Sequence, residues 1–177
     1  MNWPNQRLLD LLGIDLPIIQ APMAGLATSP MAAAVAEVGG LGSLGCALLS
    51  ADQIRAELSA VRKQTSKPIN LNFFCHTSPA TDPGREAAWR GLLKPYYVEL
   101  GLDPEMPLPA LTIDPFGTAH CNLLEDLRPS VVSFHFGLPN QELLGRVKAV
   151  GAKILSSATS VKEAIWLEQR GCDAIPS

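Results

Sequence analysis

The residue whose type and place in the sequence best suit catalysis is His135, in the segment 131–137 with the sequence Val-Val-Ser-Phe-His-Phe-Gly. It lies at the C-terminal end of a predicted strand, on the same face as Ser133. Because two phenylalanines flank it, loss of hydration would hold the pKa of its imidazole at or below about 6.5. A neutral imidazole can accept a proton from a carbon acid at pH 7. A core histidine satisfied by hydrogen bonds fits this segment equally well.

Two amide side chains point to a second functional position. Asn70 and Asn72 alternate with apolar residues along the predicted strand 68–74, so both lie on the same face of it. A buried amide needs hydrogen-bond partners, which either a planar ligand or a neighbouring strand would supply. We expect Asn72, which is nearer the end of the strand, to contact a ligand.

The segment 20–25, Gln-Ala-Pro-Met-Ala-Gly, lies at the C-terminal end of the first predicted strand, which is the ligand-binding edge of parallel α/β folds. Pro22 has no N–H to donate and Gly25 permits a sharp turn, so the backbone here is able to face a planar ligand. Taken alone, the segment is better explained as an ordinary turn between a strand and a helix.

Residues 40–45, Gly-Leu-Gly-Ser-Leu-Gly, match the GxGxxG pattern of dinucleotide-binding proteins. That fingerprint requires the glycines to lie between a strand and the following helix, with an acidic residue about 20 positions later. Here the glycines follow a predicted helix and fall inside a strand, and no such acidic residue follows. We therefore interpret them as a glycine-rich strand that a helix or a ligand approaches closely.

Metal binding and disulfide formation find little support in the sequence. Its four cysteines include no CxxC pair, which favours free thiols in a cytoplasmic protein. His76 follows Cys75 and His120 precedes Cys121, but neither pair has the spacing of metal ligands or an accompanying carboxylate cluster. We expect no metal site.

The overall composition narrows the class of partner. Hydrophobic residues make up 47% of the chain and charged residues 18%, with a formal net charge of −3, as in a folded domain without a basic patch for nucleic acid. No apolar stretch approaches the roughly 20 residues of a membrane span, and the N-terminus does not resemble a signal peptide. We expect a small-molecule partner, with neither nucleic acid nor membrane.

Alternating strands and helices must position these residues. The sequence predicts six strands, at 16–21, 41–45, 68–74, 130–136, 152–156 and 172–175. It also predicts five helices, at 31–38, 50–64, 85–100, 139–150 and 160–171. Capping boxes open the helices that follow Ser50 and Ser160. The proline-rich residues 76–128 form a long insertion between the third and fourth strands. The alternation predicts a parallel sheet, either in a TIM barrel or in a doubly wound fold, and the pattern alone does not separate them.

Several segments together resemble the nitronate monooxygenase family. The matching segments are 17–25, 39–45, 70–76, 133–137, 154–160 and 171–175, and they occur in the family order along the whole chain. The resemblance implies an FMN-binding (β/α)8 barrel that oxidises alkyl nitronates or nitroalkanes with O2 to a carbonyl compound and nitrite. It implies that Ala21, Pro22 and Met23 contact the flavin through their backbone and that Asn72 hydrogen-bonds it. His135 would remove the α-proton of a nitroalkane, or polarise the nitro group of a bound nitronate.

The C-terminal end of the sequence departs from the family pattern. The sixth predicted strand meets Pro176, and about six of the eight barrel units are present. We therefore expect residues 1–177 to form one incomplete, C-terminally truncated barrel that binds FMN poorly and self-associates through exposed strand edges. The alternatives are a related NAD(P)H-dependent flavin reductase acting on quinones or enoyl-carrier-protein substrates, and a remnant without enzymatic activity.

Overall fold

The computed structural model describes residues 3–78, 80–107 and 113–176. The chain divides into two compact units, one of Met1–His76 with Ile113–Ser177 and the other of Thr77–Thr112. The first unit contains the sheet.

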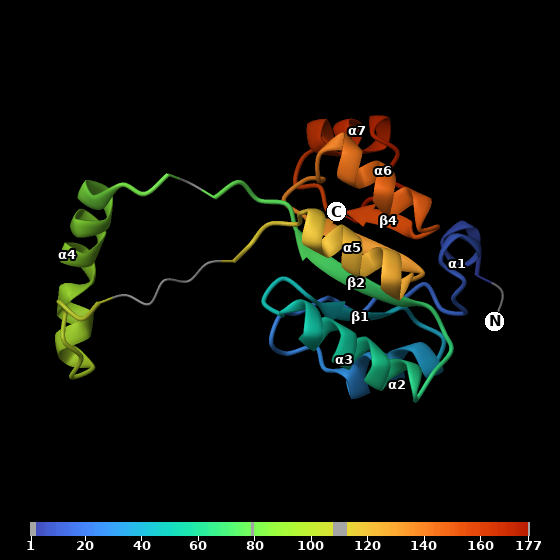
Figure 1. The fold of residues 1–177 in the computed structure, drawn as a ribbon, viewed down its shortest axis with the longest axis horizontal. Helices are drawn as coiled ribbons and strands as arrows, with labels where there is room; N and C mark the ends of the chain where they lie inside the picture. Colours follow the sequence, from blue (N-terminus) through green and yellow to red (C-terminus); the bar gives the residue numbers. More distant parts are fainter. Residues whose placement is uncertain (1–2, 79, 108–112, 177) are drawn as a thin grey trace. The chain divides into compact units, whose positions relative to one another are not determined.

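Four parallel strands form this sheet, and their order follows the order of the chain (Figure 1). They are β1 (Gly42–Gly45), β2 (Ile69–Phe74), β3 (Val131–His135) and β4 (Lys153–Ser156). Each strand pairs with the next one in sequence, whereas the strand order of a doubly wound sheet reverses at a switch point. The sequential order is that of an incomplete (β/α)8 barrel, so the predicted fold class is confirmed.

The first and sixth predicted strands differ from the prediction. Each is reduced to one parallel bridge, between Ile19 and Leu41 and between Leu155 and Ala174. At the first of these positions, Pro22 lacks the N–H that a continuing ladder needs. At the second, Pro176 imposes the same limit.

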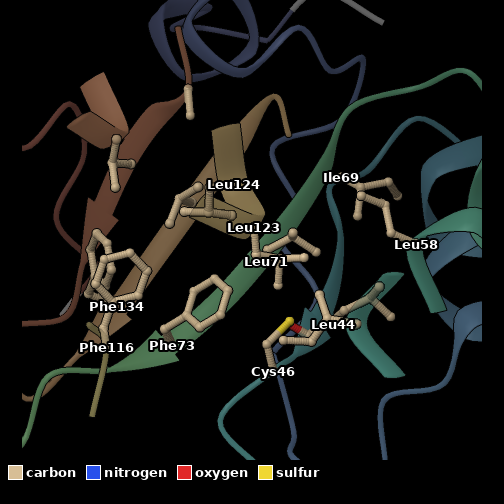
Figure 2. Close-up of a cluster of buried hydrophobic side chains, with 14 of the residues drawn as sticks. Leu44, Cys46, Leu58, Ile69, Leu71, Phe73, Phe116, Leu123, Leu124 and Phe134 are labelled. Atoms are coloured by element: carbon tan, nitrogen blue, oxygen red, sulfur yellow. The ribbon is translucent and has the colours of Figure 1, made fainter. Parts of the chain in front are cut away.

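Helices pack against both faces of the sheet, most of them against its apolar face. The first unit contains α1 (Arg7–Leu12), α2 (Ser29–Glu37), α3 (Ala51–Arg62), α5 (Thr118–Leu127), α6 (Gln141–Ala149) and α7 (Val161–Gln169). Figure 2 shows the side chains of β2 meeting those of α3 and α5, with Phe73 and Phe134 both in ring contact with Phe116. Their ring centroids lie 5.2 and 5.1 Å from that of Phe116. Edge-to-face contacts of this kind stabilise the layer beyond the burial of apolar area alone.

A glycine in β1 brings α2 directly onto the sheet. A Cβ atom on Gly42 would lie 2.1 Å from the carbonyl oxygen of Ala32, so only glycine permits this approach. The prediction of a glycine-rich strand against a closely packed helix is confirmed. The glycines lie within the strand and not at the N-terminus of a helix, as the dinucleotide fingerprint would require.

Of the two predicted capping boxes, one is complete in the structure. Ser50 and Gln53 form the predicted reciprocal capping box of α3. Ser160 caps α7 by accepting from the N–H of Glu163, but the Glu163 carboxylate accepts from Thr159 and not from Ser160. The second capping box is therefore only half formed.

Helix α1 was not predicted from the sequence. Its Leu12 packs with Leu41, Val131 and Leu155, which lie on the opposite face of the sheet from α2, α3, α5 and α6. The helix has only six residues and no side-chain cap, so it carries little local signal. Tertiary packing of its leucines holds it in place.

The residues of the predicted insertion 76–128 fall into both compact units. Helix α5 lies inside that range but packs against α3 and α6, so it belongs to the first unit. The second unit, described by itself, consists mainly of α4 (Pro83–Glu99), which begins with Asp82 as its N-cap and contains Pro95. No side chain of α4 is buried.

Candidate functional site

Polar side chains collect on one face of the sheet, which we call the polar face. It carries Ser43, Asn70, Asn72 and Ser133, all of them buried, and His135 at the end of β3. The register pairs Ser43 with Asn70 and Asn72 with Ser133. Residues paired across parallel strands share a face, so the alternation read from the sequence places these side chains together.

The side-chain amides of the two asparagines donate hydrogen bonds through Nδ2. Asn70 Nδ2 donates to Ser43 Oγ at 3.1 Å, and Asn72 Nδ2 donates to Ser133 Oγ at 3.0 Å. In the described residues, neither Oδ1 atom has a hydrogen-bond partner, although both are buried. A buried acceptor without a partner is costly, so both oxygens suit a ligand N–H group.

A hydrogen bond joins the ring of His135 to the residue that follows the neighbouring strand. Its Nδ1 lies 2.7 Å from the Oγ of Ser157, which directly follows β4. The ring is half-buried, and burial lowers the pKa of His135 below 6.5. The neutral form that the sequence predicts is therefore favoured at pH 7.

Aromatic rings surround His135. Its ring centroid lies 6.0 Å from that of Phe74 and 6.3 Å from that of Phe136, and these two phenylalanines make an edge-to-face contact at 5.1 Å. Phe136 has a φ of 65°, a left-handed conformation that is unusual for a bulky residue. Strain of this kind is concentrated at functional sites, where the surrounding structure maintains it.

The segment 20–25 is fixed against β1 by a side chain that the sequence analysis did not single out. Gln20 Nε2 donates to the carbonyl oxygen of Ser43, and Gln20 Oε1 accepts from the N–H of Ser43. A Cβ atom on Gly45 would lie 2.9 Å from the backbone nitrogen of Ala24, so this glycine permits the close approach of the segment. Ala21 and Met23 are exposed and Pro22 is half-buried.

Two pockets share His135 and Ser157 among their lining residues. The smaller, of about 200 Å³, is also lined by Gln20, Ala21, Pro22 and Asn70. The larger, of about 810 Å³, is also lined by Phe74, Phe136 and Trp166.

Three of the predicted site residues therefore border one pocket: Ala21, Pro22 and His135. Met23 and Asn72 do not line it, and Asn70 lies there in place of Asn72. Gln20 and Ser157 were missed by the sequence analysis. Strand alternation would have found Ser157, because it lies two residues after Leu155, on the polar face.

Burial keeps three of the cysteine thiols in their protonated form. Burial raises the pKa of Cys46 and Cys75 to about 12 and that of Cys172 to about 11. Within the described ranges, no three His, Cys, Asp or Glu side chains are grouped so as to hold a metal ion. None of the helices in the same ranges has the length and hydropathy needed to cross a membrane.

Residues 5–175 match the family model described as nitronate monooxygenase. The chain belongs to the nitronate monooxygenase family. It is 44% identical over 173 residues to a nitronate monooxygenase of Pseudomonas aeruginosa, and 42% identical over 174 residues to that of Paraburkholderia phytofirmans. These matches cover 96% of this chain but 48% and 47% of those proteins, so the chain spans about half the length of the curated relatives it matches.

Solved structures agree with this family assignment. The chain superposes on nitroalkane oxidase from Streptomyces ansochromogenes with a TM-score of 0.80 and 35% identity, covering 96% of this chain and 47% of that one. It also resembles FabK from Thermotoga maritima, with a TM-score of 0.67 and 25% identity over 96% of this chain and 42% of that one. The nitronate monooxygenases are a family of flavin-dependent oxidoreductases.

Proposed function

We propose that this chain carries the catalytic base and part of the flavin site of an enzyme that oxidises alkyl nitronates or nitroalkanes with O2, giving a carbonyl compound and nitrite. The observation that carries the proposal is His135: a half-buried imidazole at the C-terminal end of β3, held at Nδ1 by Ser157 and bordering both pockets. In a (β/α)8 barrel, that end of the strands is where catalytic residues gather.

FMN is the flavin that we propose for the site. Ala21, Pro22 and Met23 would face its ring through the backbone, and Asn72 would hydrogen-bond it. The buried Oδ1 atoms of Asn70 and Asn72, which have no partner in the described residues, are the acceptors that a flavin N–H requires. Bound FMN would supply the electron and oxygen chemistry, which no side chain of the site provides.

The protein itself would supply a base, hold the substrate in a fixed orientation and provide an apolar wall to the site. Burial lowers the pKa of His135, so its free nitrogen is unprotonated at pH 7 and can take the α-proton of a neutral nitroalkane. Phe74 and Phe136 lie beside the ring, with centroids 6.0 and 6.3 Å from its own, and would form an apolar wall of the site. A nitronate has already lost this proton, and for that substrate the imidazole would orient the nitro group.

Nitrite release from the purified chain tests the proposal, with FMN in excess and with 2-nitropropane or its nitronate as substrate. We expect His135→Asn to lower the rate with the nitroalkane by about 100-fold or more, and the rate with the nitronate by much less. Absence of nitrite from both substrates with the unmodified chain, once flavin absorbance shows that FMN is bound, would contradict the proposal. NADH oxidation in place of nitrite release would indicate the flavin reductase instead.

A further inference from the structure

A serine outside the predicted site makes the one side-chain hydrogen bond of His135 in the part of the chain that the structure describes. Ser157 Oγ lies 2.7 Å from His135 Nδ1, a short distance for a neutral pair. The backbone N–H of Ser157 donates to the carbonyl oxygen of Phe134 at 3.3 Å, which fixes the serine beside the last residues of β3. Ser157 is therefore held independently of the contact that its hydroxyl makes.

We propose that Ser157 is the positioning residue of His135: its Oγ accepts a hydrogen bond from Nδ1–H and so keeps Nε2 as the unprotonated nitrogen. This inference rests on the proposed function, because it assigns a role to a group that holds the proposed base.

The chemistry of imidazole gives the reason. A neutral imidazole has one protonated and one unprotonated nitrogen, and only the unprotonated one can accept a proton from substrate. A hydroxyl that accepts from Nδ1–H selects the state in which Nε2 is the base. After Nε2 has taken the substrate proton, the same Nδ1–H···Oγ bond persists and stabilises the imidazolium.

A hydroxyl is also able to donate to Nδ1, and that arrangement would leave the proton on Nε2. The two arrangements have the same heavy-atom geometry, but only the first serves a base. Because the site needs Nε2 free to remove an α-proton, the proposal commits to the accepting serine and predicts the tautomer of His135.

The tautomer is measured directly by two-bond ¹⁵N–¹H correlation spectra of the chain labelled with [¹⁵N]histidine. The chain has three histidines, and His135→Gln identifies the signals of His135 by their loss. We expect a protonated Nδ1 and an unprotonated Nε2 in the unmodified chain at pH 7.5. A protonated Nε2 there would overturn the proposal without any variant of Ser157.

Variants then assign the effect to the hydroxyl. Ser157→Ala should convert the His135 signals to averaged or Nε2-protonated values, while Ser157→Thr, which keeps a hydroxyl, should preserve them. Ser130→Ala is the matched control: Ser130 is exposed at the opposite end of β3, and its substitution should leave all three histidines unchanged. An unaltered His135 spectrum in Ser157→Ala would contradict the proposal.

Kinetics separate this inference from the function on which it rests. With FMN in excess, Ser157→Ala should lower the rate with a neutral nitroalkane by about 10- to 100-fold, and the rate with the nitronate by less than about 3-fold. Equal losses with both substrates would indicate a merely structural role and overturn the proposal. If the unmodified chain turned over neither substrate while the spectra behaved as expected, the proposed function would fail and the selection of the tautomer by Ser157 would stand.

Discussion

The side-chain amide of Gln20 pairs with the main chain of Ser43 as a neighbouring strand would. Its Nε2 donates to the Ser43 carbonyl oxygen at 3.3 Å, and its Oε1 accepts from the Ser43 N–H at 3.2 Å. Two residues before Ser43, the carbonyl oxygen of Leu41 accepts from the backbone N–H of Gln20. The side chain thus continues the ladder where the backbone turns away toward Pro22, and it joins the candidate flavin-contacting segment to the sheet.

Replacing this amide should destabilise the fold. Gln20→Leu leaves the buried N–H and carbonyl groups of Ser43 without partners, and we expect the free energy of unfolding to fall by about 1–3 kcal/mol. Urea unfolding followed by circular dichroism measures the change. Gln64→Leu is the control, because Gln64 is exposed and should shift the value by less than about 0.5 kcal/mol. Equal effects of the two variants would show that the Gln20 pairing contributes nothing.

Contact between α2 and β1 depends on the absence of a side chain at Gly42. Gly42→Ala would place a methyl group 2.1 Å from the Ala32 carbonyl oxygen, and the helix backbone would have to move. We expect a loss of about 3 kcal/mol or more in unfolding free energy, or an insoluble product. Gly145→Ala in α6, where a Cβ meets nothing within 4 Å, should instead stabilise the chain by about 0.5–1 kcal/mol. Thermal unfolding of both variants decides the matter, and tolerance of Gly42→Ala would refute the packing argument.

Arg128 ends α5 in a left-handed conformation, with a φ of 45°, and its side chain is exposed. Glycine adopts this conformation without the steric cost that a Cβ imposes. Arg128→Gly should therefore raise the unfolding free energy by about 1 kcal/mol. Arg128→Ala removes the same side chain but retains a Cβ, so it should give no gain. A gain of the same size from alanine would assign the effect to the lost arginine and not to the backbone.

Stability should decline in mild acid because of two half-buried histidines. Burial lowers the pKa of His120 and of His135 below 6.5, while Asp114 partly opposes the shift at His120. The unfolded chain therefore binds more protons than the folded chain between the lowered values and 6.5. The contribution of these histidines is complete above pH 6.5 and is lost as the pH falls through the folded-state pKa values.

Urea unfolding midpoints at intervals from pH 7.5 downward measure this slope. His120→Gln should flatten the curve below pH 6.5, because one of the two protonation sites has been removed. The Nδ1 atom of His120 accepts from the N–H of Gly117, so the variant should also lower stability above pH 6.5. A curve parallel to that of the unmodified chain would contradict a lowered His120 pKa.

The cysteines should resist thiol reagents in the folded chain. Burial raises the pKa of Cys46 and Cys75 to about 12, so almost no thiolate is present at pH 8. We expect 5,5′-dithiobis(2-nitrobenzoic acid) to label these two residues only after urea is added, as peptide mapping would show. Rapid labelling of Cys75 in the native chain would indicate that the end of β2 opens readily.

Much of the secondary structure could be predicted from the sequence, because the residues that indicate it are close together in the chain. Alternation along residues 69–74 placed both asparagines on one face, and the Ser50–Gln53 box and the terminal glycines located helices to within two residues at each end. The Ser-Phe-His-Phe-Gly segment located His135 at the end of a strand. These features depend on residues near one another in the chain, so propensity and periodicity are sufficient to predict them.

Other features depend on residues far apart in sequence. The barrel and the doubly wound sheet share one pattern of elements, and only the pairing of each strand with the next in the chain separated them. Helix α1 exists because its leucines meet Leu41, Val131 and Leu155, and α5 belongs with the sheet because it packs against α3 and α6. No local signal reports such contacts.

The candidate site likewise combines features that the sequence determined with features that depend on the tertiary structure. The sequence by itself determined that His135, Ala21 and Pro22 lie at strand ends, because strand alternation and backbone chemistry are properties of short segments. Only the tertiary structure decided that Ser157 holds His135, that Gln20 anchors its segment to Ser43, and that Asn70 borders the smaller pocket. Each of those relationships joins residues more than 20 positions apart, where the register of the strands sets which side chains meet.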